Sequence, residues 1–445
     1  MLKIDKFLFY VAMAFVIYMP LHVLIVQWFS LATGGIEVWK AAKDIIIVIL
    51  VPILLFVSYK KGLFQDKTFR WLALLATLYA LLHLFFVAFD QNDDTYSAIV
   101  GSVFNIRLMG FLLLGLVVGN MKEGQKYLKY LLTASVLIAT AVAAFGVAQY
   151  FLPPDLLTNV GYSLERGVKP LFFIDDRPEL PRVMSTLKDP NSLGAYLILP
   201  ILITGLALIK NKLQSQFFIR NFRREVLAVM LVIQLTALVL SFSRGALLGL
   251  IISGGVVFAL LYGHKALQVV KKYWYVALAL SLLVPFSIFL ARDSALVQDY
   301  VFHAAVSTDQ ADPNQKRIQL QEEAIEDILQ EPEGYGPGSA GLVSISNPQG
   351  GLLTENYYLQ IAYEVGWLGL TLFMAIIGLL IYKLQKASNL LSENRATAVV
   401  LLASLAGYLF YSLLIHLWSN EAVALQWWLL SGVAVGLSLK RNLHR

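Results

Sequence analysis

The sequence has 445 residues, of which 58% are hydrophobic and only 14% are charged, with a mean hydropathy of +0.68. A soluble protein carries about a quarter charged residues, so this composition excludes an ordinary soluble enzyme. There is no cysteine, which excludes disulfides, thiolate catalysis and cysteine-based metal sites. None of the six histidines stands in a spacing such as His-x-x-x-His, so we expect no metal site of that kind.

The apolar residues form runs close to the roughly 20 residues that cross a bilayer as a helix. These runs are too long and unbroken for barrel strands. We therefore predict an all-α polytopic membrane protein with about twelve transmembrane helices. The predicted spans are 7–29, 41–58, 70–89, 98–119, 128–150, 190–209, 225–241, 245–262, 273–291, 357–382, 397–416 and 421–438. No small-residue cleavage site follows the first, so we expect it to be retained rather than removed as a signal peptide.

Basic residues gather in alternate connections, as at Lys60 and Lys271, whereas the short connections of the other side hold only Lys40, Lys43 and Arg244. The positive-inside rule then predicts a bacterial inner-membrane protein with both termini in the cytoplasm. This placement explains the net charge of +6 without nucleic acid, and it indicates contact with anionic membrane lipids.

Two long connections, 151–189 and 292–356, fall on the outer side in this topology. Long connections without a domain of their own are often functional. No internal repeat or separate soluble domain is visible, so 1–445 is interpreted as a single membrane domain. The second connection is predicted to be a large periplasmic loop that contains helices between spans nine and ten and carries catalytic residues.

Polar residues cluster in four outer segments, the first of which leads into the sixth span. Asp189 or Asn191 is expected to cap that helix, with Pro190 in its first turn. Arg182 and Lys188 place two cations near the helix N-terminus, which suits an anion.

The second segment is Ser241-Phe242-Ser243-Arg244-Gly245, a tight connection between spans seven and eight. Arg244 either extends its charge toward water or has a functional role. Because both neighbouring spans are otherwise apolar, this polar cluster with Ser243 favours a function. Gly245 permits close approach of another backbone.

The third segment is the long outer loop, in which 316–329 has the periodicity of a helix that begins near Arg317. The apolar residues of one face are Ile318, Ile325, Ile328 and Leu329. This pattern predicts a surface helix over the membrane domain. The Gly-rich run 334–338 that follows either holds a phosphate through backbone N–H groups or forms a turn.

The fourth segment, 354–359, enters span ten. Thr354 or Asn356 is expected to cap this helix, and Tyr358 either stacks on a sugar ring or lies in the interfacial aromatic belt. Glu364, deeper in the same span, and Arg107 in span four are charges at membrane depth that need partners. The sequence leaves open whether they pair with each other.

Together these segments resemble the O-antigen ligase and polymerase superfamily, the Wzy/WaaL type, from about Arg182 to Gly369. The resemblance is carried by the order and spacing of five motifs. They are Asp189-Pro190-Asn191, Ser241 to Gly245, Arg317 at a helix start with the Gly-rich turn after it, Glu355-Asn356-Tyr357-Tyr358-Leu359, and Glu364-Val365-Gly366-Trp367-Leu368-Gly369. Ligases of this family usually have His where this chain has Glu355, so the departure favours the polymerases.

The resemblance implies glycosyl transfer from an undecaprenyl-diphosphate-linked saccharide, with no metal and no other cofactor. The leaving diphosphate then needs cations, for which Arg244 and Arg317 are the first candidates. Glu355 is the candidate general base; no histidine lies near span ten in the sequence, which leaves a carboxylate as the local option. Further candidate contacts to the diphosphate or sugar are Arg182, Lys188, Asn191, Ser243, Asn356 and Tyr358.

The implied partners are the lipid-linked donor, a saccharide or lipid-linked acceptor, and a chain-length regulator. The alternative function is a transporter or flippase of a lipid-linked oligosaccharide. Transporters typically show repeated halves, whereas here the polar motifs gather on one face. The sequence leaves open the choice of ligase or polymerase, the sugar, the linkage and stereochemistry, the acceptor and the oligomeric state.

Overall fold

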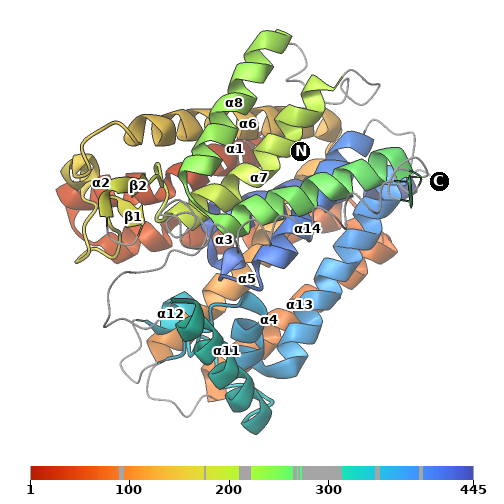
Figure 1. Cartoon of the computed structure of the whole chain (residues 1–445). Helices are drawn as coiled ribbons and strands as arrows, with labels where there is room; N and C mark the ends of the chain where they lie inside the picture. Colours follow the sequence, from red (N-terminus) through yellow and green to blue (C-terminus); the bar gives the residue numbers. More distant parts are fainter. Residues whose placement is uncertain are drawn as a thin grey trace.

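The structure is a computed structural model that describes residues 2–89, 95–174, 177–209, 222–263, 268, 271–272, 313–345, 351–389 and 394–443. Helices dominate it (Figure 1). The α-helices are α1 (Leu2–Tyr18), α2 (His22–Thr33), α3 (Ile36–Lys60), α4 (Lys67–Phe89), α5 (Thr95–Gly119), α6 (Gly124–Gln149), α7 (Pro190–Leu208), α8 (Arg224–Leu240), α11 (Pro313–Gln330), α12 (Gly341–Ser344), α13 (Tyr357–Asn389), α14 (Arg395–Tyr411) and α15 (Glu421–Leu443). Another helix covers Arg244–Gly263. The remaining elements are the short helical turns η1 (Met19–Leu21), η2 (Leu63–Gln65), η3 (Leu156–Val160) and η7 (Leu417–Ser419), with strands β1 (Phe172–Ile174) and β2 (Arg177–Arg182).

Nine helices among the described residues are long and apolar enough to cross a membrane. In the first, Lys3–Thr33, α1 continues into α2 through the tight turn η1, which contains Pro20. α8 and α14, with 17 residues each, are slightly shorter. Every predicted span except the ninth coincides with one of these helices, and 273–291 lies outside the described residues. The multi-pass membrane architecture is therefore confirmed, while the count of twelve stays a prediction.

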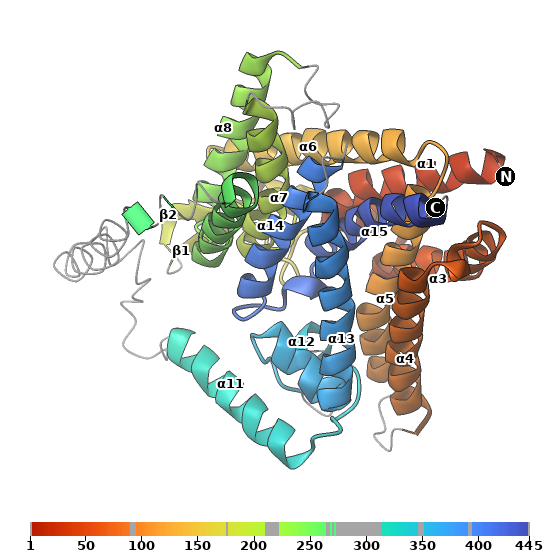
Figure 2. The ribbon, with the colours of Figure 1, turned by 90° about the vertical axis from the view of Figure 1, so that its right-hand side faces the viewer.

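The ends of the chain lie on one side of the molecule, and the β1–β2 hairpin lies on the opposite side (Figure 1 and Figure 2). The hairpin belongs to the long connection 151–189. This arrangement agrees with a topology in which the termini and that connection face opposite sides of the membrane. Which side is cytoplasmic stays a prediction.

The hairpin corrects the all-α prediction. β1 and β2 are antiparallel, with Phe172 opposite Arg182. β2 contains Pro178 and Pro181, which cannot donate to a strand ladder but are tolerated because a two-stranded ribbon has only edge strands. Such a segment has no alternating strand pattern, which is why the sequence did not predict it.

α5 and α15 pack with their backbones in contact because each carries two glycines four residues apart. Gly115 and Gly119 lie on α5, and Gly432 and Gly436 lie on α15. A Cβ atom at any of these positions would overlap with the backbone of the other helix. Small residues at this spacing are typical of close helix packing in membranes, and this pair forms the centre of the bundle.

Three buried charges and the largely buried Glu421, 19% exposed, join α3, α5 and α15. Nη1 of Arg107 lies 3.2 Å from Oδ1 of Asp44 and 3.6 Å from Oε1 of Glu421. Nζ of Lys43 lies 3.2 Å from Oδ2 of Asp44 and 3.5 Å from the same Glu421 oxygen. Two cations therefore face two anions, as buried membrane charges require. The pairing of Arg107 with Glu364 that the sequence left open does not form.

Replacing Arg107 with methionine is expected to destabilise the protein strongly. Arg107→Met leaves two carboxylates facing Lys43 alone, and breaking one partner from a buried ion pair costs about 3–5 kcal/mol. Thermal unfolding of the purified protein in detergent measures this loss. The control is Lys126→Met, because Lys126 is 54% exposed and its pair with Glu123 is a surface ion pair, for which we expect less than about 1 kcal/mol. Equal losses in both variants would contradict the prediction.

Candidate active site

Glu355 occupies a strained backbone position immediately before α13. Its φ of +48° lies in the left-handed region that favours glycine. The next residue, Asn356, caps the helix, since its Oδ1 accepts the N–H groups of Tyr358 at 2.9 Å and Leu359 at 3.3 Å. We call this junction between the loop and α13 the Glu355 corner. Its left-handed backbone conformation is unfavourable for glutamate, so surrounding contacts must hold it in place.

His416 holds this corner. Its Nε2 accepts the backbone N–H of Glu355 at 3.2 Å, so the proton of the neutral ring is on Nδ1, 2.9 Å from Oε1 of Gln360. Burial and, to a lesser extent, the nearby Lys188 lower the pKa of His416 to about 3, so the ring stays neutral and accepts this bond. The expectation that no histidine is available near span ten is therefore wrong, because the fold brings in one from 61 residues further along the chain.

The segment Tyr411–His416, at the end of α14, also binds other parts of the site. The hydroxyl of Tyr411 lies 2.7 Å from Oγ of Ser243. The carbonyl of Ser412 accepts the N–H of Tyr357 at 2.9 Å. The connection between α8 and the next helix, the start of α13 and the Glu355 corner are thus fixed to one short segment.

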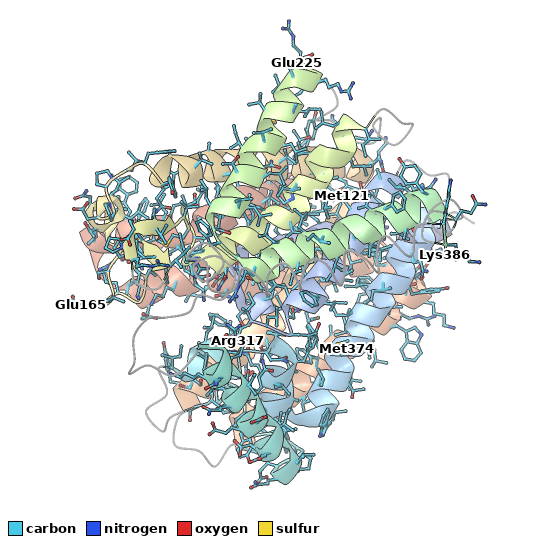
Figure 3. All side chains as sticks on the ribbon, viewed as in Figure 1. Met121, Glu165, Glu225, Arg317, Met374 and Lys386 are labelled. Carbon is cyan, nitrogen blue, oxygen red and sulfur yellow. The ribbon has the colours of Figure 1, made fainter. Side chains whose placement is uncertain are left out.

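Arg317 lies on α11 opposite Glu355. Its Nη2 is 3.5 Å from Oε2 of Glu355, and the two side chains are 36% and 26% exposed. Gln321, one turn further along, donates to the carbonyl of Glu355 at 3.3 Å. Nε of Arg317 is buried and has no hydrogen-bond partner among the described residues. Figure 3 shows Arg317 at the end of α11 that faces the rest of the bundle.

α11 buries a different face from the predicted one. Ile328 is buried as expected, together with Ala324. Ile318, Ile325 and Leu329 are instead 56%, 47% and 69% exposed. Periodicity identified the helix but not the face that is buried.

The turn before α7 brings two further charges toward Glu355. Asp189 is the cap of α7, because its Oδ1 accepts the N–H of Ser192 at 2.8 Å and its Oδ2 accepts the hydroxyl at 2.7 Å. This confirms the predicted cap. Lys188 and Asp189 both lie near enough to act electrostatically on the Glu355 carboxylate.

Burial and these charges shift the pKa of the Glu355 carboxyl group. Burial raises its pKa above the ordinary value, Asp189 adds to this, and Arg317 and Lys188 oppose it without cancelling it. A carboxylate with a raised pKa accepts a proton more readily near neutral pH. The site therefore contains a base of increased strength beside cations.

The guanidinium of Arg182 forms hydrogen bonds within the protein. Its Nε donates to the carbonyl of Ser241 at 3.2 Å, and its Nη2 donates to Oδ1 of Asn191 at 3.3 Å. The same group lies 3.5 Å from the carbonyl of Phe242, whose φ of +49° is also in the left-handed region. Arg182 thus holds a second strained turn in place and connects it to α7.

Arg244 begins the helix after that turn, and its side chain is exposed. A Cβ atom on the adjacent Gly245 would overlap with the ring of Tyr411. This close approach explains the glycine of the motif. Arg244 is therefore attached to the same segment, Tyr411–His416, that positions Glu355.

Glu364 anchors the Gly-rich run before α12. Its Oε1 accepts the N–H of Gly338 at 3.1 Å, and its carbonyl accepts the N–H of Gly336 at 2.9 Å. Its Oε2 accepts a hydrogen bond from Asn105 at 2.7 Å. Because α13 engages these N–H groups, the structure favours the turn over the phosphate site among the two interpretations of the run.

The structure brings Arg317, Glu355 and Lys188 together from distant parts of the sequence. The other predicted contacts have polar atoms bound within the protein, as Tyr358 shows by donating its hydroxyl to the carbonyl of Leu409 at 2.9 Å. The residues that the sequence did not single out are His416, Gln360, Gln321 and Tyr411. The polar residues His416, Ser419 and Asn420 between two apolar spans were the signal available for the first of them. No group of three or more His, Asp or Glu side chains is placed to hold a metal ion within the described residues.

The fold and site together define a multi-pass membrane protein with a carboxylate and several cations gathered at one end of its helices. Residues 229–374 match the family described as O-Antigen ligase. This match confirms the resemblance to the O-antigen ligase and polymerase superfamily and supports, in general terms, a glycosyltransferase-like enzyme. It contains Arg244, Arg317 and Glu355 but neither Lys188 nor His416. A search of curated proteins found no match to this chain.

Because the backbone of Glu355 is strained, we expect glycine to be more stable than alanine at this position, the reverse of the usual order. Glu355→Gly and Glu355→Ala both remove the carboxylate, but only glycine accepts the left-handed conformation without cost. We expect the glycine variant to be more stable by about 1 kcal/mol in thermal unfolding.

The matched control is Glu322, an exposed residue inside α11. There the order is expected to reverse, with Glu322→Gly less stable than Glu322→Ala by about 1 kcal/mol. The same order at both positions would show that Glu355 is not strained.

Proposed function

We propose that the chain transfers or polymerises saccharide units from an undecaprenyl-diphosphate carrier at the outer face of the inner membrane, with polymerisation favoured. The observation that carries this proposal is the ion pair of Glu355 with Arg317, within electrostatic reach of Lys188. A half-buried base beside cations suits a reaction in which a hydroxyl loses a proton while a diphosphate leaves.

In the proposed reaction, Glu355 accepts the proton of an acceptor hydroxyl as that oxygen attacks the anomeric carbon of the donor sugar. The bond between this carbon and the diphosphate oxygen breaks, and its electron pair stays on the diphosphate. Arg317 and Arg244 bind the leaving group, because the planar guanidinium fork matches phosphate oxygens. Lys188 adds a third positive charge.

The remaining predicted residues support the site in this proposal. Arg182 and Asn191 hold the turn that carries Arg244, and Asn356 holds the start of α13. Ser243 and Tyr358 fix the same elements to α14. The choice of polymerase rests on Glu355, since ligases of the family usually have His there.

Removing the base or the facing arginine is expected to abolish polymer formation. Glu355→Gln keeps the shape of the side chain but cannot accept a proton, and we expect a loss of about 10²–10⁴-fold in rate. Arg317→Ala removes a donor to the leaving diphosphate and is expected to cost about 10²–10³-fold. The assay uses purified protein in vesicles with lipid-linked saccharide isolated from cells that lack the chain, with new glycosidic bonds detected by mass spectrometry.

Lys316→Ala is the control, because Lys316 is the exposed neighbour of Arg317 on α11. It is expected to keep the wild-type rate. Unchanged bond formation in both site variants would exclude the assignment. Movement of the lipid-linked saccharide across the vesicle membrane without any bond formation would favour the alternative, a transporter or flippase.

The dependence of the rate on pH tests the role of Glu355 separately. A base acts only when deprotonated, so the rate is expected to fall as the pH drops through the raised pKa of Glu355. Arg317 lowers the pKa of Glu355, and Asp189 raises it. Arg317→Ala should therefore move the acid limb of the profile to higher pH. Asp189→Asn, which keeps a good helix cap, should move it to lower pH. Shifts in the same direction would exclude Glu355 as the titrating base.

A further inference from the structure

A cavity of about 500 Å³ opens at the end of α13 opposite Glu355. Its lining comes from the start of α4 and from the later turns of α13. The lining residues are Gln65, Asp66, Lys67, Thr68, Trp71, Leu379, Tyr382 and Lys383. We refer to it as the α4–α13 cavity. Its volume lies within the roughly 300–1,000 Å³ typical of small-molecule sites. It lies at the predicted cytoplasmic border, away from the candidate active site.

The charges of this lining leave one positive charge uncompensated. Lys67 and Lys383 are cationic, and Asp66 is the one anion among the eight residues. Oδ1 of Asp66 is engaged by the N–H groups of Thr68 at 2.7 Å and Phe69 at 3.1 Å, so this carboxylate caps α4. Neither lysine has an ion pair with any described residue. The cavity therefore suits a ligand with a single negative charge.

An exposed apolar stripe runs along α4 away from the cavity. Its residues Trp71, Leu74, Leu78 and Leu81 are 49%, 46%, 42% and 54% exposed. They recur at the spacing of one helix face. Trp71 begins the stripe and also lines the cavity, and Tyr382 on α13 is 57% exposed. Aromatic residues at this position mark the border between lipid headgroups and acyl chains.

We propose that the α4–α13 cavity binds the phosphodiester headgroup of an anionic glycerophospholipid, with an acyl chain along the α4 stripe. Lys67 and Lys383 face the phosphate, and Trp71 contacts the beginning of the chain. A monoanionic phosphodiester balances the lining charge, and basic pockets between helices on the cytoplasmic side are typical of such recognition. The lipid lies across α4 and α13 and so stabilises the contact between these two helices.

Native mass spectrometry of the delipidated full-length protein tests the charge selectivity, with phosphatidylglycerol as the probe and phosphatidylcholine as the zwitterionic comparison. Wild-type protein is expected to bind the first phosphatidylglycerol at least about tenfold more tightly, since a lysine near an anionic lipid contributes about fivefold. The double variant Lys67→Gln/Lys383→Gln should lose this preference. The control Lys122→Gln/Lys126→Gln removes the same charge from the same predicted border and should keep it.

Fluorescence quenching locates the lipid. Phosphatidylglycerol brominated near the start of an acyl chain should quench part of the tryptophan emission of the wild type, and the conservative variant Trp71→Phe should lack that part. Equal binding of both lipids by the wild type would overturn the proposal. So would equal loss of preference in both double variants, or quenching that persists in Trp71→Phe.

Discussion

The hydrogen bond from the backbone N–H of Glu355 to Nε2 of His416 is the contact on which the candidate site depends. It holds a residue that would not otherwise adopt a left-handed conformation, and it needs a neutral imidazole with its proton on Nδ1. That proton is donated to Gln360, which in turn donates to the buried Glu364. Asn105 on α5 donates to the same carboxylate. The strained corner is therefore connected to the centre of the bundle by a continuous chain of hydrogen bonds.

α13 is kinked at Val365 and Gly366, just after the Glu364 that ends this chain. Gly366 has a φ of +67°, and N–H of Trp367 donates to the carbonyl of Pro332, so the loop after α11 inserts at the kink. A side chain at Gly366 would overlap with the carbonyl oxygens of Pro332 and Glu333. The loop that positions α11, and with it Arg317, is thus fixed to the same helix that follows Glu355. α13 therefore helps to position the backbone segments that carry both the arginine and the carboxylate.

Local features were predictable from the sequence, and partners distant in the chain were not. Hydropathy located the spans because a bilayer demands long apolar runs, and Asp189 was one of two cap candidates, with Asn191, on either side of Pro190. Arg107 was identified as a buried charge, but its partners Asp44 and Glu421 lie in other spans, and only packing brings them together. His416 was missed for the same reason. The roles of Arg182 and the Gly-rich run depended on which backbone groups surround them, which no local pattern reveals.

The two groups of charges in this protein differ in exposure, since the side chain of Arg107 is 0% exposed whereas those of Arg317 and Glu355 are 36% and 26% exposed, and this difference bears on the proposed reaction. Around Arg107 two cations face two anions, so the group is balanced and suits a structural role. Around Glu355, Arg317 and Lys188 act on two carboxylates, those of Glu355 and Asp189. In the proposed reaction, the charge of Glu355 is lost when it accepts the proton of the acceptor, which would release Arg317 toward the diphosphate as the negative charge develops there. The cation is therefore more available in the transition state than in the ground state, which is the condition for an interaction to accelerate a reaction.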